Sequence, residues 1–165
     1  MSKSPGSSAT EAIKAIKADA EAAGESIFAV PGFKLSVPIE VRFRDTDAMG
    51  HMNNAVFLTF LEVARAHYWK FLFGTKDYKD VGFILARAEA DYRSPAYGGE
   101  TLLVGIRTEK LGESSFTMGY QIRERDHGRL IADAGTVLVM FDYLARKKMP
   151  IPKNIREAIA RFEGI

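Results

Sequence analysis

The chain contains no cysteine among its 165 residues. This absence excludes disulfide bonds, thiolate metal sites and a cysteine nucleophile together, and it is compatible with a reducing compartment. We therefore expect a cytoplasmic protein.

The formal net charge is only +2, so the sequence lacks the basic surface that is typical of nucleic-acid-binding proteins. We expect no nucleic-acid partner.

Long apolar runs are also scarce. The segment over residues 1–26 has no continuous apolar stretch of the kind that signal peptides carry, and its acidic residues argue against a transit peptide. The most hydrophobic segment, residues 55–73, is interrupted by Glu62, Arg65 and Lys70, so we do not expect it to span a membrane. The sequence also lacks a phosphate loop and a dinucleotide fingerprint, so it indicates no cofactor.

With 47% hydrophobic residues, the chain can build one globular domain with a sizeable core. Residues 1 to about 8 are small and polar, and residues 9–23 are an alanine-rich stretch with few large apolar side chains. We predict a loosely docked arm over residues 1–36, partly disordered or helical, and a single domain over residues 37–165. A partner-binding role of the arm is the alternative.

The domain begins with a predicted strand in which Ile39, Val41 and Phe43 alternate with charged residues. Residues 54–73 then carry apolar side chains on nearly every face of a helix, which Gly74 would end. A helix of this kind is expected to be buried and to be wrapped by a sheet. Glu62 and Arg65 are three residues apart, so they could form an ion pair on the surface of this helix or at an interface.

The remainder of the chain alternates as strands do, with turn signals at residues 94–100, 111–115 and 125–129. These connections are short enough for antiparallel neighbours. A short amphipathic helix is predicted over residues 154–164. The fold class is therefore α+β, with an antiparallel sheet around a long central helix. The apolar sets predicted to share a face are Ile84, Ala86, Ala88, Ala90 and Tyr92; Leu102, Val104 and Ile106; Phe116, Met118, Tyr120 and Ile122; and Ile131, Val137, Val139 and Phe141.

The stretch "RFRDTDAMGHMNN", residues 42–54, holds more polar groups than a turn requires. Together with the following helix it resembles the signature of the hotdog-fold acyl-CoA thioesterases, the 4-hydroxybenzoyl-CoA thioesterase-like family. The resemblance extends through "ADYRSPAYGGETLLV" and "IPKNIREAIARF" and covers about residues 37–163. It implies a hotdog fold, hydrolysis of an acyl-CoA with water as the only cosubstrate, and a homodimer or homotetramer with shared active sites. Acyl-carrier-protein thioesterases are similar, but they usually carry Asn at the position of Met49.

The resemblance also assigns roles. Asp47 matches the carboxylate that attacks the thioester or activates water, the backbone N–H of Asn54 matches the oxyanion donor, and Asp45 is structural. A site that hydrolyses a thioester needs a base or nucleophile on one side of the thioester carbonyl and hydrogen-bond donors on the other. The backbone N–H groups at a helix N-terminus supply such donors. Taken alone, Asp47 could equally be a turn acid, and Asn53 could hold the reacting group or cap the helix.

Other polar residues carry weaker signals. His51 could orient Asp47, contact substrate or move a proton, or it could be structural. Glu62 is the alternative catalytic carboxylate, since some thioesterases of this fold use a helix glutamate. We expect His67 to be a core or interface residue and His127 to lie at a hairpin tip. Three scattered histidines predict no metal site.

Two other functions stay open: a non-catalytic acyl-thioester-binding protein and a hotdog hydratase or dehydratase. The latter would need a catalytic histidine together with a helix carboxylate. An apolar pocket beside the motif would accept aromatic, short, branched and long acyl groups alike, so the sequence assigns no substrate-binding residue. Ser114 and Ser115 could contact the nucleotide, although a plain turn is the simpler interpretation.

Overall fold

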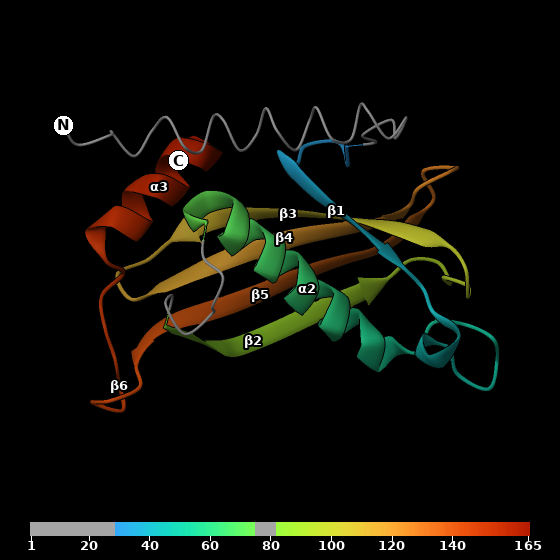
Figure 1. Cartoon of the computed structure of the whole chain (residues 1–165), viewed down its shortest axis with the longest axis horizontal. Coiled ribbons are helices and arrows are strands. Elements are labelled where there is room, and N and C mark those ends of the chain that lie inside the picture. The colour runs from blue at the N-terminus through green and yellow to red at the C-terminus, as the bar shows by residue number, and fades with distance from the viewer. Residues whose placement is uncertain (1–28, 75–81) are drawn as a thin grey trace.

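Six antiparallel strands form one sheet in the computed structural model, which describes residues 29–74 and 82–165. The strand order is β1-β3-β4-β5-β2, with the short β6 beside β5. Helix α2 (Asn54–Phe73) lies across one face of this sheet, and helix α3 (Lys153–Glu163) lies near one end of it (Figure 1). This arrangement confirms the predicted α+β fold. The strands are β1 (Leu35–Glu40), β2 (Phe83–Tyr92), β3 (Thr101–Leu111), β4 (Ser115–Glu124), β5 (Leu130–Asp142) and β6 (Lys147–Lys148).

Helix α2 spans Asn54–Phe73, as the sequence predicts. Gly74 ends it in the left-handed conformation with φ 63°, where glycine has no steric penalty. The helix is not buried on every side, however, because a single layer of sheet covers only one of its faces. Leu58 is 45% exposed, and Glu62 and His67 are exposed as well. Of the two positions expected for His67, the core is therefore wrong, and an interface stays a prediction.

The first strand is shorter than its alternating pattern predicts. β1 ends at Glu40, and Phe43–Asp45 forms a 3-10 helix, η1. The carboxylate of Asp45 accepts the backbone N–H of Arg42 at 2.9 Å, which favours this turn over a continued strand. Phe43 is consequently 93% exposed. The prediction that it shares a buried face with Val41 is wrong.

In β2 and β5, the side chains that point toward the helix differ from those that the sequence predicts. In β2 the register shifts between Leu85 and Arg87, and such a bulge moves the residues on one side of it to the opposite face. Ile84 therefore does not share the face of Ala88 and Tyr92. In β5 the fully buried residues over this region are Leu138 and Met140. The predicted core set Val137, Val139 and Phe141 lies on the other face.

The connections are mostly as predicted. The turns near residues 112–114 and 125–129 join β3 to β4 and β4 to β5, which are neighbours in the sheet. Residues 93–100, by contrast, carry the chain from β2 at the edge to β3, so these two strands are not the predicted neighbours. β2 pairs with β5 instead, and local turn signals cannot show a pairing between strands so far apart in the chain.

The C-terminal helix α3 spans Lys153–Glu163, as predicted, and buries Ile155 and Ile159. Its end is tied to α2 because the hydroxyl of Tyr68 donates to the Glu163 carboxylate at 2.8 Å. The same carboxylate accepts the backbone N–H of Thr108 at 2.8 Å. Burial, the largest influence, raises the pKa of Tyr68, so this hydroxyl stays a donor.

The predicted N-terminal helix over residues 9–23 lies outside the described residues, and the predicted boundary at residue 36 stays a prediction. The part of the arm next to the domain contacts the sheet: Val30 is buried, and the guanidinium of Arg107 lies 4.9 Å from the ring of Phe33. Across residues 29–74 and 82–165, no helix is long and apolar enough to cross a membrane.

Candidate functional site

The polar stretch forms a loop that backbone hydrogen bonds close at its base. Asn53 donates its backbone N–H to the carbonyl of Asp45 at 2.8 Å, and Thr46 and Met52 form an isolated antiparallel bridge. A further bond runs from the N–H of Met52 to the carbonyl of Ala96 at 2.8 Å. The loop is therefore held against the start of α2 and against the segment that follows β2.

Asp45 is a structural residue, as predicted. Its carboxylate is only 4% exposed and forms two bonds with the guanidinium of Arg42, at 2.8 and 2.9 Å. This hydrogen bonding, above all other influences, lowers the pKa of Asp45. A carboxylate with both oxygens engaged in this way is a poor nucleophile or base.

Asp47 is exposed and closes a turn. One carboxylate oxygen, Oδ1, accepts the backbone N–H of Met49 at 2.8 Å and, more weakly, that of His51 at 3.4 Å. Gly50 sits in this turn with φ 78°, which favours glycine. The role of turn acid that the sequence left open is therefore real. The other carboxylate oxygen accepts no hydrogen bond from the described residues, so it is available to a ligand.

Judged by the described residues, the first turn of α2 offers one backbone N–H that has no acceptor. The amide oxygen of Asn53 accepts the N–H of Ala55 at 2.9 Å, and its carbonyl accepts that of Val56 at 2.9 Å. Asn53 is thus the helix N-cap, one of its two predicted roles. The N–H of Asn54 reaches no acceptor within the part of the chain that the structure describes. A free N–H at the positive end of a helix dipole can stabilise an oxyanion.

His51 is half-buried and its ring makes no hydrogen bond with the described residues. The ring instead meets that of Tyr97 edge-on, with centroids 5.3 Å apart. The two residues also form an isolated backbone bridge. His51 therefore does not orient Asp47 through its ring, and contact with substrate, proton transfer and a structural role remain open for it.

Two tyrosines beside the loop had no role in the sequence-based prediction. The hydroxyl of Tyr92 donates to the carbonyl of Asn54 at 3.2 Å, and its ring contacts Phe57 at 4.9 Å. Tyr97 contacts His51. Both tyrosines lie in "ADYRSPAYGGETLLV", the second segment that carries the family resemblance. Their position in that segment was the signal that they border the site.

Glu62 and Arg65 do not form the predicted ion pair. Arg65 is 7% exposed and points inward, where its Nη1 donates to the hydroxyl of Tyr120 at 3.4 Å. Glu62 stays exposed on the helix. Packing of Arg65 between helix and sheet separates the two charges that helical spacing alone would bring together.

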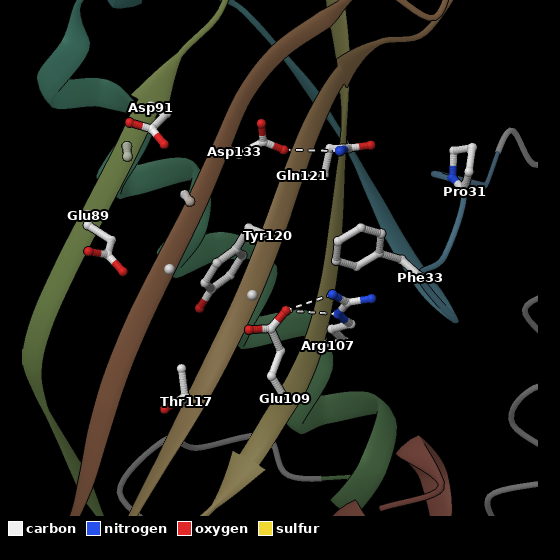
Figure 2. Close-up of a pocket in the computed structure, with 14 residues that line it drawn as sticks. Pro31, Phe33, Glu89, Asp91, Arg107, Glu109, Thr117, Tyr120, Gln121 and Asp133 are labelled. Carbon is white, nitrogen blue, oxygen red and sulfur yellow. Dashed lines mark hydrogen bonds and ion pairs between the residues drawn. The ribbon is translucent and has the colours of Figure 1, made fainter.

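A pocket of about 490 Å³ lies on the sheet face opposite α2 (Figure 2). None of the residues of the polar loop lines it. Figure 2 shows several carboxylates in it, among them Glu89 on β2, Asp133 on β5 and Glu109 on β3, with Arg107 already paired to Glu109 at 2.7 Å. An acidic lining repels the phosphates of a nucleotide. This pocket is therefore not the thioester site.

The remaining polar candidates lie in turns. His127 lies at the tip of the β4–β5 hairpin, as predicted, with its Nδ1 3.1 Å from a carboxylate oxygen of Glu124. Gly112 donates to the carbonyl of Ser115 at 2.7 Å, which makes residues 112–115 a plain turn. No group of three or more potential ligand side chains that could hold a metal ion occurs within the described ranges.

Comparison with known proteins identifies the family. The thioesterase-like superfamily model matches residues 41–159. The chain is 26% identical over 133 residues to the long-chain acyl-CoA thioesterase FadM of Escherichia coli, a match that covers 78% of this chain and 98% of FadM. It is 29% identical over 132 residues to a 1,4-dihydroxy-2-naphthoyl-CoA hydrolase of Prochlorococcus marinus, with 70% of this chain and 80% of that protein covered.

Among solved structures, a thioesterase from Thermus thermophilus in complex with coenzyme A and zinc superposes with a TM-score of 0.74 at 38% identity. The match covers 82% of this chain and 98% of the Thermus chain. The resemblance carried by residues 42–65 thus extends over the whole domain. The chain belongs to the thioesterase-like superfamily and is a thioester hydrolase with the hotdog fold.

Proposed function

We propose that the protein hydrolyses an acyl-CoA to the free acid and CoA at the loop before α2. The observation that carries this proposal is a free carboxylate oxygen on Asp47 seven residues before the free backbone N–H of Asn54, with both groups held by one hydrogen-bonded loop. Asp47 supplies the negative charge that drives attack. Asn54 donates to the carbonyl oxygen, where charge develops in the transition state.

The reaction balances with water alone. Either Asp47 removes a proton from water while the water oxygen bonds to the acyl carbon, or Asp47 attacks first and water hydrolyses the resulting anhydride. In each route the carbon–sulfur bond breaks, and the CoA sulfur leaves as a thiolate that takes a proton. The N–H of Asn54 stabilises the oxyanion in both, so the same two residues serve either mechanism.

The active form that we propose is a dimer built through β2. This ten-residue strand is at one edge of the sheet, and it carries exposed apolar side chains. Leu85 is 48% exposed and Tyr92 is 50% exposed. A long edge strand with exposed apolar residues is a template for pairing with another strand. A second copy would cover it and would shield the exposed Asp47 from water.

Such a dimer also suggests where CoA binds. Tyr143, in the hairpin between β5 and β6, donates its hydroxyl to the carbonyl of Phe83 at 3.0 Å, so the hairpin lies at the start of β2. Figure 1 shows β6 at that end of the molecule, opposite the start of α2. Antiparallel pairing of two β2 strands brings the start of one beside the end of the other. The partner's hairpin would then lie next to Tyr92 and Asn54.

The hairpin has the charge that CoA phosphates require. Arg146, Lys147 and Lys148 are exposed and join no ion pair within the described residues. Three cations on one tip attract the diphosphate and ribose phosphate groups of CoA. We expect Lys147→Glu with Lys148→Glu to raise KM for acyl-CoA by about 10-fold or more, with little change in kcat. A steady-state comparison with the matched variant Lys153→Glu, on α3, measures this.

The proposal is tested by release of free CoA from a panel of aromatic, short, branched and long acyl-CoAs. We expect the parent to hydrolyse part of the panel and Asp47→Asn to lose on the order of 10² or more in kcat while still binding acyl-CoA. A comparable loss in Glu62→Gln, with Asp47→Asn active, would move the chemistry onto α2. Dialysis against a chelator should leave hydrolysis unchanged.

The non-catalytic alternative predicts a different result from the same panel. If the parent binds acyl-CoAs but releases no CoA above the uncatalysed rate, the protein is a binding module. Sedimentation tests the dimer separately, since only monomer at micromolar concentration would contradict the shared site. The cytoplasmic location stays a prediction from the sequence.

A further inference from the structure

Arg65 is buried between α2 and the sheet without a carboxylate partner. It is 7% exposed, and its hydrogen bond to the neutral hydroxyl of Tyr120 is long, at 3.4 Å. Asp45 and Glu124, the buried acids of the described residues, both have cationic or N–H partners. A buried charge without a counter-ion is costly. No carboxylate among the described residues lies within ion-pair distance of Arg65, so a counter-ion from a second copy of the chain would stabilise its charge.

An unpaired acid lies on the same side of the helix. Leu58, Glu62, Arg65 and Trp69 follow one another at intervals of three and four residues, so they form one strip along α2. Trp69 contacts Phe116 of β4 and Phe83 of β2, with ring centroids 5.6 and 5.5 Å apart, so the end of this strip lies over the half of the sheet that runs from β4 to the β2 edge. Glu62 is exposed and joins no ion pair within the described ranges.

Two ring contacts show how α2 is aligned with β2. Phe57, near the start of the helix, contacts Tyr92 at the end of the strand, with centroids 4.9 Å apart. Trp69, near the end of the helix, contacts Phe83 at the start of the strand. Helix and strand therefore run in opposite directions, and the middle of β2 lies level with the middle of the helical segment between Phe57 and Trp69.

That middle falls between Glu62 and Arg65. If two β2 strands pair over their full length, the two-fold axis that relates the copies passes through the middle of the strand. The part of α2 between Glu62 and Arg65 therefore lies level with that axis. The two α2 helices then run antiparallel on either side of the axis. Glu62 of one copy reaches the same level as Arg65 of the other, and the symmetry repeats the pair on the opposite side.

We infer that Arg65 takes its counter-ion from the partner's Glu62, in two symmetric ion pairs across the β2 dimer. This inference rests on the dimer of the proposed function and assigns Glu62 a role in assembly. Opposite charges at one level fix the register of the two strands, because a slip along β2 would leave both charges unpaired. The pairs would thereby hold each active site against the partner's hairpin.

Charge reversal tests the pairing. In Glu62→Arg, the introduced guanidinium of each copy would face Arg65 of the other, and in Arg65→Glu two carboxylates would face each other. We expect each variant alone to raise the dissociation constant of the dimer by about 10-fold or more, measured by sedimentation equilibrium. Glu62→Gln, a change at an exposed position, should weaken the dimer without changing the circular dichroism of the protein.

Mixing the two reversed variants separates pairing between copies from pairing within one chain. A heterodimer of Glu62→Arg with Arg65→Glu has opposite charges on both sides of the axis, whereas each chain by itself keeps two like charges. We expect the equimolar mixture to form heterodimer at concentrations where either variant alone is monomeric. Native mass spectrometry distinguishes the heterodimer from both homodimers.

The outcomes are distinct. Heterodimer formed only on mixing supports the pairs, and a mixture that stays dissociated contradicts them. If Arg65→Glu fails to fold, Glu62→Gln and Glu62→Arg decide the question, because a dimer as tight as the parent in both overturns the inference. A parent that is monomeric overturns the β2 dimer itself. None of these readings depends on hydrolysis, so loss of the inference leaves the proposed reaction standing.

Discussion

Two loops of this protein share a local pattern and differ in what surrounds them. The loop at residues 45–54 and the hairpin at residues 124–129 each contain a carboxylate that accepts two backbone N–H groups, a glycine with positive φ and a histidine. In the hairpin, Glu124 is 3% exposed, and its two oxygens accept from Asp126 at 2.5 Å and from His127 at 2.8 Å. In the first loop, Asp47 is exposed and keeps one oxygen free of the described residues.

The difference lies in the next element along the chain. The hairpin joins β4 to β5, whose backbone groups are already paired in the sheet. The first loop leads into α2, where the N–H of Asn54 has no acceptor among the described residues. A carboxylate in a turn thus does not by itself indicate catalysis. It does so when it lies beside unpaired backbone N–H groups that can bind a carbonyl oxygen.

The largest expected effect separates the two carboxylates by activity. Asp47→Asn should lower kcat for acyl-CoA hydrolysis by on the order of 10² or more, while Glu124→Gln should leave kcat within about twofold. Glu124→Gln should instead lower the Tm by roughly 3–8 °C, since one buried N–H loses its acceptor. Stopped-time CoA assays and thermal unfolding of both variants measure the two effects.

Equal losses of activity in both variants would contradict this contrast. Such a result would mean that the hairpin affects turnover or that both changes act through stability. The assay is therefore run well below the Tm of the weaker variant.

A smaller effect is expected at Asp45, two residues before Asp47. Asp45→Asn should destabilise the fold because the Arg42 guanidinium and backbone N–H lose charged acceptors, while its effect on kcat should be much smaller than that of Asp47→Asn. The sign of the pH dependence follows from the pKa of Asp45, which the hydrogen bonds from Arg42 lower. The carboxylate stabilises the fold above its unfolded pKa of about 3.9 and loses this contribution as the pH falls through the lower folded value.

Urea unfolding across the acidic range measures this dependence. The stability difference between the parent and Asp45→Asn should be constant from neutral pH to about pH 4 and should shrink below it. Glu124 should add to the acid sensitivity of the parent, because hydrogen bonds from Asp126 and His127 outweigh burial, the largest single influence, and lower its pKa. A difference that persists unchanged at the lowest pH would mean that Asp45 acts by shape and not by charge.

Local signals explain which parts of the fold the sequence predicted. The ends of α2 follow from Asn53, whose side chain caps the first turn, and from Gly74, which takes the left-handed conformation. These are interactions within a few residues of chain, so a sequence displays them directly. The motif around Asp47 was predicted for the same reason, although its chemical role came from the family resemblance.

Non-local packing explains the parts that the sequence did not predict. The bulge after Leu85 and the buried face of β5 depend on which strands pair, and β2 pairs with β5 although β3 follows it in the chain. Arg65 likewise turns inward toward Tyr120, on a strand far along the sequence. The N–H of Asn54 was expected from the family resemblance to be a donor, but only the folded loop shows that no acceptor among the described residues reaches it.

The smallest expected effect compares the two histidines of these loops. The side chain of His127 is 85% exposed, so His127→Ala should change neither kcat nor Tm measurably. His51 is half-buried against Tyr97 and lies in the loop that holds Asp47. His51→Phe keeps the ring contact and removes the two ring nitrogens, so a role in proton transfer predicts a several-fold loss of kcat in the CoA-release assay. A kcat that matches the parent's would show that His51 only packs, because the same loop then works with an apolar ring.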